Sequence, residues 1–202
     1  LQDAVPIRLG QEFKAYSVAV LRDIRRMDKA MDEMRTLNMG GTAVGTGLNA
    51  DEAYLRRIVP NLSEISDMEL VQAYDLIDST QNLDPFVAVS GAVKACAVTL
   101  SKIANDLRLM SSGPRAGFGE INLPAKQNGS SIMPGKVNPV IPEVMNQISY
   151  KVIGNDLCVT MSGEAAQMEL NAMEPVMAQC CFESADLLMN GFDTLRTLCI
   201  DG

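Results

Sequence analysis

Two long segments keep an uninterrupted three-four spacing of apolar residues, and this periodicity constrains the fold more than any other feature of the chain. The first segment runs over residues 10–37 and the second over residues 86–110. Apolar side chains at these intervals fall on one face of an α-helix. The repeated positions are Phe13, Tyr16, Val20, Ile24, Met27, Met31 and Met34, then Phe86, Val89, Val93, Cys96, Leu100, Ile103, Leu107 and Met110. A helix of about 27 residues is roughly 40 Å long, and helices of this length normally pack side by side.

Capping residues and prolines predict where these and further helices begin and end. Asp84 and Pro85 supply an N-cap and a first-turn proline for the second long helix, which Gly113-Pro114 ends. A third helix is predicted from Pro139, with Asn138 as its N-cap, and a fourth from Glu174-Pro175. A shorter helix is expected over 51–59, ending at Pro60 because a proline cannot donate the next helical hydrogen bond.

Strand patterns are nearly absent from the chain, so the predicted fold class is all-α. Only 4% of the residues are aromatic, tryptophan is missing, and 13 residues are methionine. A core of aliphatic and thioether side chains suits helix-on-helix seams. The sequence therefore predicts a bundle of long helices, with residues 1–202 forming one helical domain.

The charge distribution excludes several classes of partner. The formal net charge is −8 and no basic cluster is present, whereas nucleic acids and anionic membrane surfaces require concentrated lysine and arginine. The longest apolar segment carries Lys94, Lys102, Asp106 and Arg108, which argues against a membrane span. A small anion can still be bound by one or two cations.

The five cysteines indicate reduced thiols rather than disulfides or a metal site. Their number is odd and no C-x-x-C spacing occurs, so we expect buried structural thiols in a cytoplasmic protein. The chain has no histidine, so a zinc site would lack its usual ligands and no metal site is predicted.

The segment Gly129–Pro139, with the sequence GSSIMPGKVNP, is the strongest functional signal. Its glycines and prolines exclude a continuous helix or strand. Small residues let backbone N–H groups approach a ligand, and Lys136 adds a positive charge. The segment is therefore interpreted as an anion-binding loop.

This segment resembles the signature loop of the aspartase/fumarase superfamily. The resemblance extends to LQDAVP at 1–6, GTAVGTGLN at 41–49, KIANDLR at 102–108 and SGPR at 112–115, in family order. It implies a central helical domain whose long helices assemble into a homotetramer with active sites shared between subunits. It also implies that 1–202 is a fragment lacking an N-terminal and a C-terminal domain, with a threonine and a histidine expected before Leu1.

The resemblance assigns roles to five residues. Ser130 matches the serine that acts as the catalytic base, and Ser131 matches a residue that hydrogen-bonds the substrate carboxylate. Lys136 and Asn138 match residues that bind the other carboxylate, and Glu143 matches a glutamate that orients the active-site histidine. Simpler interpretations exist, because Ser-Ser beside glycine is common in turns, Asn138 can cap a helix, and Glu143 suits a first helical turn.

Two features favour the aspartase side of the superfamily. The segments STQNLD at 79–84 and VSGAVK at 89–94 resemble aspartases, and Glu174 stands where fumarases typically carry lysine. The implied reaction is the reversible elimination of ammonia from L-aspartate to give fumarate, through an aci-carboxylate intermediate and without an organic cofactor. Fumarate hydration is the alternative reaction, and a non-catalytic helical oligomerisation scaffold is an alternative of another class.

Overall fold

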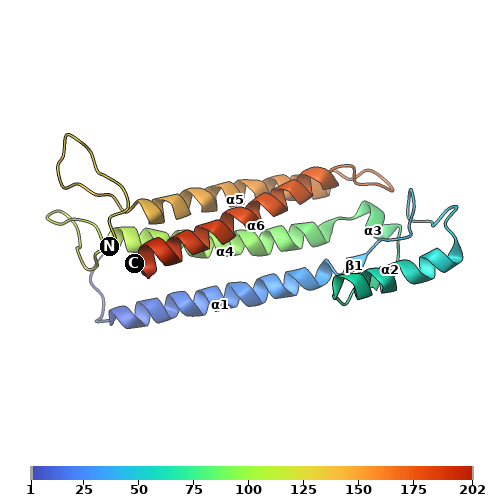
Figure 1. Ribbon diagram of the computed structural model, residues 1–202, viewed down its shortest axis with the longest axis horizontal. Helices are drawn as coiled ribbons and strands as arrows, with labels where there is room; N and C mark the ends of the chain where they lie inside the picture. Colours follow the sequence, from blue (N-terminus) through green and yellow to red (C-terminus); the bar gives the residue numbers. More distant parts are fainter. Residues whose placement is uncertain (1, 202) are drawn as a thin grey trace. The chain divides into compact units, whose positions relative to one another are not determined.

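The computed structural model describes residues 2–201 and confirms the predicted all-α fold (Figure 1). The helices are α1 (Leu9–Glu33), α2 (Glu52–Ser66), α3 (Asp78–Gln81), α4 (Asp84–Met110), α5 (Val140–Glu164), α6 (Glu174–Leu195) and the π-helical segment η1 (Arg196–Ile200). Two short strands, β1 (Thr36–Leu37) and β2 (Val71–Gln72), pair in parallel on either side of α2 in the sequence. The boundaries of α4 and the start of α6 agree with the sequence prediction.

The chain divides into two compact units. The first contains residues 2–26, 94–152 and 186–201, and the second contains residues 27–93 and 153–185. The helices α1, α4, α5 and α6 each contribute residues to both units. The loop at 129–139 belongs to the first unit. The prediction of one helical domain over 1–202 stays a prediction.

The core of the first unit is built mainly on the C-terminal two thirds of α4. The side chains of Leu100 and Leu107 are at most 2% exposed, and complete burial of such a side chain contributes about 1.5–3 kcal/mol. The other buried apolar residues of this unit are Cys96, Ala97, Ile103 and Ala104 in α4, Met145 and Val152 in α5, and Leu188, Leu195 and Cys199 in α6 and η1. The three-four spacing of α4 thus forms a core stripe.

The second unit combines an apolar cluster with buried polar pairs. Val159 and Met177 are fully buried, and Cys180 packs with them. Ser90 Oγ of α4 donates to Asp156 Oδ1 of α5 at 2.9 Å, and Asn155 donates to Ser184 Oγ of α6 at 3.0 Å. Buried polar groups are stabilised only when they are hydrogen-bonded, so these pairs restrict how α4, α5 and α6 align in this unit.

Within residues 2–201, α4 is the one helix that is long and apolar enough to cross a membrane by composition alone. Three charged residues in its C-terminal half are engaged within the chain, since Lys102 pairs with Asp106 and Arg108 donates to Asn146. Its apolar residues form the core stripe of the first unit. These are the features of a core helix in a helical bundle.

The first long helix ends earlier than its apolar pattern predicts. The periodicity continues to Leu37, but α1 ends at Glu33 and residues 36–37 form β1. The backbone of this segment pairs instead with β2, because Val71 N donates to Arg35 O at 3.0 Å and Ala73 N to Leu37 O at 2.9 Å. A ladder formed by distant residues therefore overrides the local helical pattern.

The predicted end of the shorter helix at Pro60 is wrong. Asp51 caps α2, accepting from Ala53 N at 2.7 Å, but the helix continues through Pro60 to Ser66. Pro60 is exposed, so the carbonyl left without a donor can be solvated. The helix ends where Asp67 adopts a left-handed conformation and donates to Ser63 O.

All five cysteines are free, as predicted from the sequence. Burial, with a smaller contribution from Asp23, raises the pKa of the Cys96 thiol to about 11. Burial also raises the pKa of Cys181, with a contribution from Asp156, and the pKa of Cys199. A raised pKa keeps a thiol protonated and unreactive at neutral pH, which fits a structural role.

Candidate active site

The candidate site lies in the connection between α4 and α5, which extends beyond the ends of these helices in the first unit (Figure 1). Two glycines shape the loop. A Cβ atom placed on Gly129 would lie 1.4 Å from the carbonyl oxygen of Lys136, so the two sides of the loop are in contact at this point. Gly135 has φ +81°, a left-handed conformation that favours glycine. The loop geometry therefore depends on glycine at both positions.

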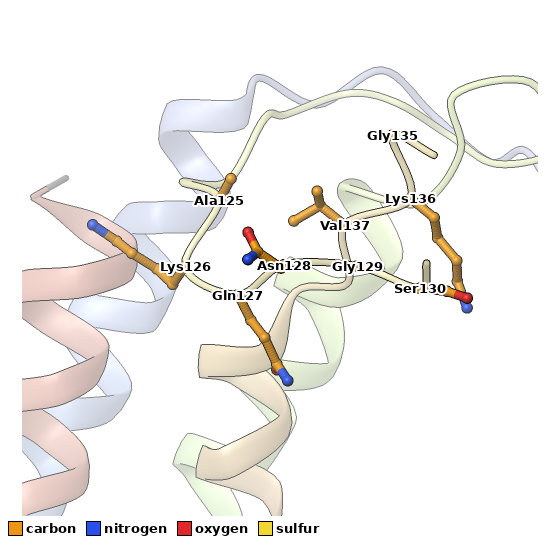
Figure 2. Close-up of a pocket in the computed structure, with 9 residues that line it drawn as sticks. All are labelled: Ala125, Lys126, Gln127, Asn128, Gly129, Ser130, Gly135, Lys136 and Val137. Carbon is orange, nitrogen blue, oxygen red and sulfur yellow. The ribbon is translucent and has the colours of Figure 1, made fainter. Parts of the chain in front are cut away.

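Two adjoining hollows, of about 390 and 320 Å³, are formed by this loop. Both lie within the size range of small-molecule sites. The first is shown in Figure 2. Its lining consists of Ala125, Lys126, Gln127, Asn128, Gly129, Ser130, Gly135, Lys136 and Val137, and the second is lined by Gln127, Asn128, Gly129, Ser130, Lys136, Asn138 and Val140. The structure thus brings together three of the five residues singled out by sequence, namely Ser130, Lys136 and Asn138.

Ser130 is held in a turn of the loop. Its Oγ accepts a hydrogen bond from Ile132 N at 3.2 Å, and its carbonyl accepts from Met133 N at 3.2 Å. The turn suggested by the Ser-Ser pair therefore exists. An N–H donor aimed at the hydroxyl oxygen also stabilises negative charge on that oxygen. The turn and a chemical role for Ser130 are consequently compatible.

Lys136 supplies positive charge that no carboxylate in the described chain neutralises. Its backbone N donates to Met133 O at 3.1 Å, and within residues 2–201 its ammonium group forms no ion pair. No aspartate or glutamate lines either hollow. In Figure 2 the side chains of Ser130 and Lys136 project on the same side of the loop, whereas Lys126 points away from them. The hollow is therefore suited to an anion.

Asn138 does not act as the helix cap that the sequence suggested. Helix α5 begins at Val140, so Pro139 directly precedes it. The contact that Asn138 makes with the helix start is a backbone one, from Val140 N to Asn138 O at 2.9 Å. In the described chain no helical N–H group bonds to the Asn138 side chain. Its amide therefore remains available in the second hollow.

The structure places Ser131 and Glu143 outside the two hollows. Ser131 is exposed on the loop, and Glu143 lies in the first turn of α5, as its helix-dipole interpretation predicted. Glu143 is 4.0 Å from Arg108, between its Oε1 and the arginine Nη2. The roles implied for these two residues stay predictions.

Sequence reasoning missed Gln127 and Asn128, which line both hollows. Their side chains provide amide donors next to Ser130 and Lys136, and amides can bind a carboxylate without adding charge. Their position immediately before Gly129 was the available signal. Their contribution follows from the close approach of Gly129 to Lys136, because this contact folds residues 125–128 back beside residues 135–138.

Comparison with protein families identifies a family for the segment that contains the candidate loop. Residues 1–154 match a family described as "Lyase". The chain belongs to this lyase family. The match includes the whole candidate loop and the first part of α5, so every residue discussed for the site lies within the lyase segment.

One curated relative is the aspartate ammonia-lyase of Bacillus subtilis, which is 54% identical to this chain over 202 residues. The alignment covers all of the present chain but 42% of the relative. The chain therefore spans about two fifths of the length of this relative.

Solved lyase structures share the fold. A fumarate lyase:delta crystallin from Brucella melitensis, bound to cobalt, superposes with a TM-score of 0.96 and 51% identity, covering 100% of this chain and 44% of that one. A class II fumarase from Schistosoma mansoni superposes with a TM-score of 0.94 and 30% identity, covering 98% and 44% of the two chains. The same helical scaffold thus occurs in proteins named for different lyase reactions.

Proposed function

We propose that the whole protein is an ammonia-lyase that converts L-aspartate reversibly to fumarate and ammonia. The observation that carries this proposal is the joint placement of the Ser130 hydroxyl, the Lys136 ammonium group and the Asn138 amide around hollows that contain no carboxylate. This arrangement suits a dicarboxylate and places a potential base beside it. The lyase family and the Bacillus subtilis relative support the reaction class.

In the proposed reaction Ser130 acts as an alkoxide base. It takes a proton from the carbon next to one carboxylate, and the electron pair of the broken C–H bond moves into that carboxylate, giving a doubly charged aci-carboxylate. The electron pair then returns to form the C=C bond as the C–N bond breaks. Ammonia leaves with the electron pair of that bond, and Ser130 retains the abstracted proton until solvent removes it.

Lys136 and Asn138 bind the other carboxylate of the substrate in this proposal. Lys136 provides a point charge and Asn138 provides an amide donor. Ser131 hydrogen-bonds the carboxylate beside the reacting carbon, which requires a change from its exposed position on the loop. The reaction needs no organic cofactor, because the electron pair is held by the substrate carboxylate itself.

The leaving group separates this proposal from fumarate hydration. The aspartate ammonia-lyase relative is 54% identical, against 30% for the fumarase structure. Glu174, the first residue of α6, also stands where fumarases typically carry a lysine, so the resemblance to aspartases includes this position. Both observations support ammonia as the leaving group.

A side-by-side assay tests the reaction. The whole protein is offered L-aspartate and L-malate separately, and fumarate is followed by ultraviolet absorbance with ammonia measured in parallel. We expect equal amounts of fumarate and ammonia from aspartate and little fumarate from malate. Faster conversion of malate would assign the protein to the fumarases, and turnover of neither substrate would leave the scaffold as the better explanation.

We further propose that copies of the chain assemble through α5 into a homotetramer with shared active sites. The free cysteines suit a reducing, cytoplasmic environment, which is part of the same proposal. The helix leaves Tyr150, Ile153, Leu157 and Met161 exposed at three-four spacing, with exposed fractions of 38–63%. These positions share one helix face. Covering each contributes up to about 1.5–3 kcal/mol, and the opposite face is already buried in the chain.

Light scattering tests this assembly. The 202-residue chain should show a mass of at least twice its 21.8 kDa, and Leu157→Glu should lower that mass because it places a charge in the middle of the apolar stripe. Ile65→Glu is the matched control, since Ile65 is an 82% exposed apolar residue of α2 outside the stripe. A folded wild-type monomer would contradict the proposal, as would equal effects of both substitutions.

A further inference from the structure

Four polar side chains connect α4 and α5 behind the candidate loop. Ser101 and Arg108 come from α4, and Glu143 and Asn146 come from the first two turns of α5. All four belong to the first compact unit. Glu143 lies one turn after Val140, which lines the second hollow. The network therefore ends one helical turn from a residue that lines the proposed substrate site.

The buried amide of Asn146 fixes the orientation of this network. Its Nδ2 donates to Ser101 Oγ at 2.9 Å and to Ser101 O at 3.1 Å. With the nitrogen committed to Ser101, the amide oxygen faces Arg108 and accepts from Nη1 at 3.0 Å. Asn146 is 3% exposed, so leaving these groups without partners would be costly. One end of the guanidinium is thus held in place.

The other end of the same guanidinium faces Glu143. Arg108 Nη2 lies 4.0 Å from Glu143 Oε1, with 40% and 33% of the two side chains exposed. A planar guanidinium can serve both partners from one position, whereas a lysine ammonium offers a single point charge. Arg108 is therefore placed to offset part of the charge of Glu143.

This charge balance matters for a doubly negative ligand. A carboxylate at the start of α5 would repel a dicarboxylate bound beside Lys136 and Asn138, and charges within about 10 Å are incompletely screened at ordinary ionic strength. We propose that Arg108 is a positioning residue that offsets the charge of Glu143, with Asn146 holding the guanidinium, so that the hollow accepts a dicarboxylate. This inference rests on the proposed function, which supplies the dicarboxylate.

A simpler role predicts a different outcome. Arg108 in the last turn of α4 and Glu143 in the first turn of α5 are both favoured by the helix dipoles. If that were their whole role, removing Arg108 would lower the stability of the protein. Any effect on ligand affinity would then be the same whether residue 143 is glutamate or glutamine. The two roles are separated by measuring ligand binding in both Glu143 backgrounds.

A double-mutant cycle on the whole protein provides this measurement. The dissociation constant of succinate is determined by calorimetry for wild type, Arg108→Met, Glu143→Gln and the double variant. We expect Arg108→Met to weaken succinate binding about tenfold, or about 1.4 kcal/mol, in the wild-type background and less than twofold in the Glu143→Gln background. High salt should reduce the difference, because it screens the repulsion.

Three comparison variants make the cycle specific. Arg108→Lys keeps the charge without the fork and should lose about threefold, which also covers the case in which Arg108→Met does not fold. Arg196→Met is the matched control, because Arg196 is paired with Asp193 and Asp201 and lines neither hollow, and it should bind succinate like wild type. Lys136→Ala should weaken succinate equally in both Glu143 backgrounds, because the proposal has Lys136 contact the ligand directly.

Two outcomes would overturn the inference while leaving the proposed function standing. One is unchanged succinate affinity in both Arg108 variants, and the other is an equal loss in both Glu143 backgrounds, which would mean that Arg108 acts independently of Glu143. Failure of the wild-type protein to bind any dicarboxylate would instead remove the proposed function, and the inference with it.

Discussion

Replacing Ser130 by alanine should lower the turnover of the whole protein on aspartate at least a thousandfold, equivalent to about 4 kcal/mol of barrier. The substitution removes the only group proposed to take the proton, while Lys136 and Asn138 remain to bind substrate. The Michaelis constant should therefore change much less than the turnover number. Steady-state kinetics with ammonia release as the readout measures both quantities.

The neighbouring serine provides the matched control for this experiment. Ser131→Ala removes a hydroxyl of the same type from the same loop, but Ser131 does not line either hollow. Its effect should be smaller, because its proposed role is a single hydrogen bond to a carboxylate. Turnover of Ser130→Ala within about tenfold of wild type would exclude Ser130 as the base, and a larger loss for Ser131→Ala would reverse the two assignments.

The sequence predicted the helices well where one pattern acts over many residues. The stripe of α4 fixes both its length and its buried face, because each apolar position agrees with the others. Prediction was wrong at points governed by contacts between distant residues. The end of α1 depends on the pairing of β1 with β2. The residues at 34–37 give no local indication that they pair with a strand at 71–72.

Pro60 illustrates a different limit of sequence reasoning. A proline removes one hydrogen-bond donor from a helix, but whether the helix ends there depends on the rest of the helix and on solvent access. In α2 the residue is exposed, and the helix continues to a left-handed end at Asp67. The local rule is valid, but its outcome depends on the fold.

The candidate site was recognised from a motif, and the structure adds how its members are brought together. Ser130 and Lys136 are six residues apart, and the sequence alone does not say that they share a hollow. The contact of Gly129 with the Lys136 carbonyl provides this proximity. The same contact brings in Gln127 and Asn128, whose residue types carry no signal by themselves.

Gly129→Ala should accordingly disable the site without disturbing the helices. A Cβ atom at this position would lie 1.4 Å from the Lys136 carbonyl oxygen. No rotamer change can relieve this clash, because the backbone fixes the position of the Cβ atom and the oxygen is itself a backbone atom. The loop must open, which separates Ser130 from Lys136. We expect turnover on aspartate to fall at least a hundredfold, about 2.7 kcal/mol, with weaker succinate binding and an unchanged helical circular dichroism spectrum.

Gly135→Ala distinguishes loss of this contact from general strain in the loop. Gly135 has a positive φ, +81°, unlike Gly129, but nothing lies within 4 Å of a Cβ built there. Alanine in that conformation costs about 1–2 kcal/mol, and the loop can stay closed. Gly135→Ala should therefore impair turnover less than Gly129→Ala. Equal effects would mean that backbone strain, rather than closure of Gly129 on Lys136, controls the site, and wild-type activity of Gly129→Ala would show that catalysis does not require this closed loop.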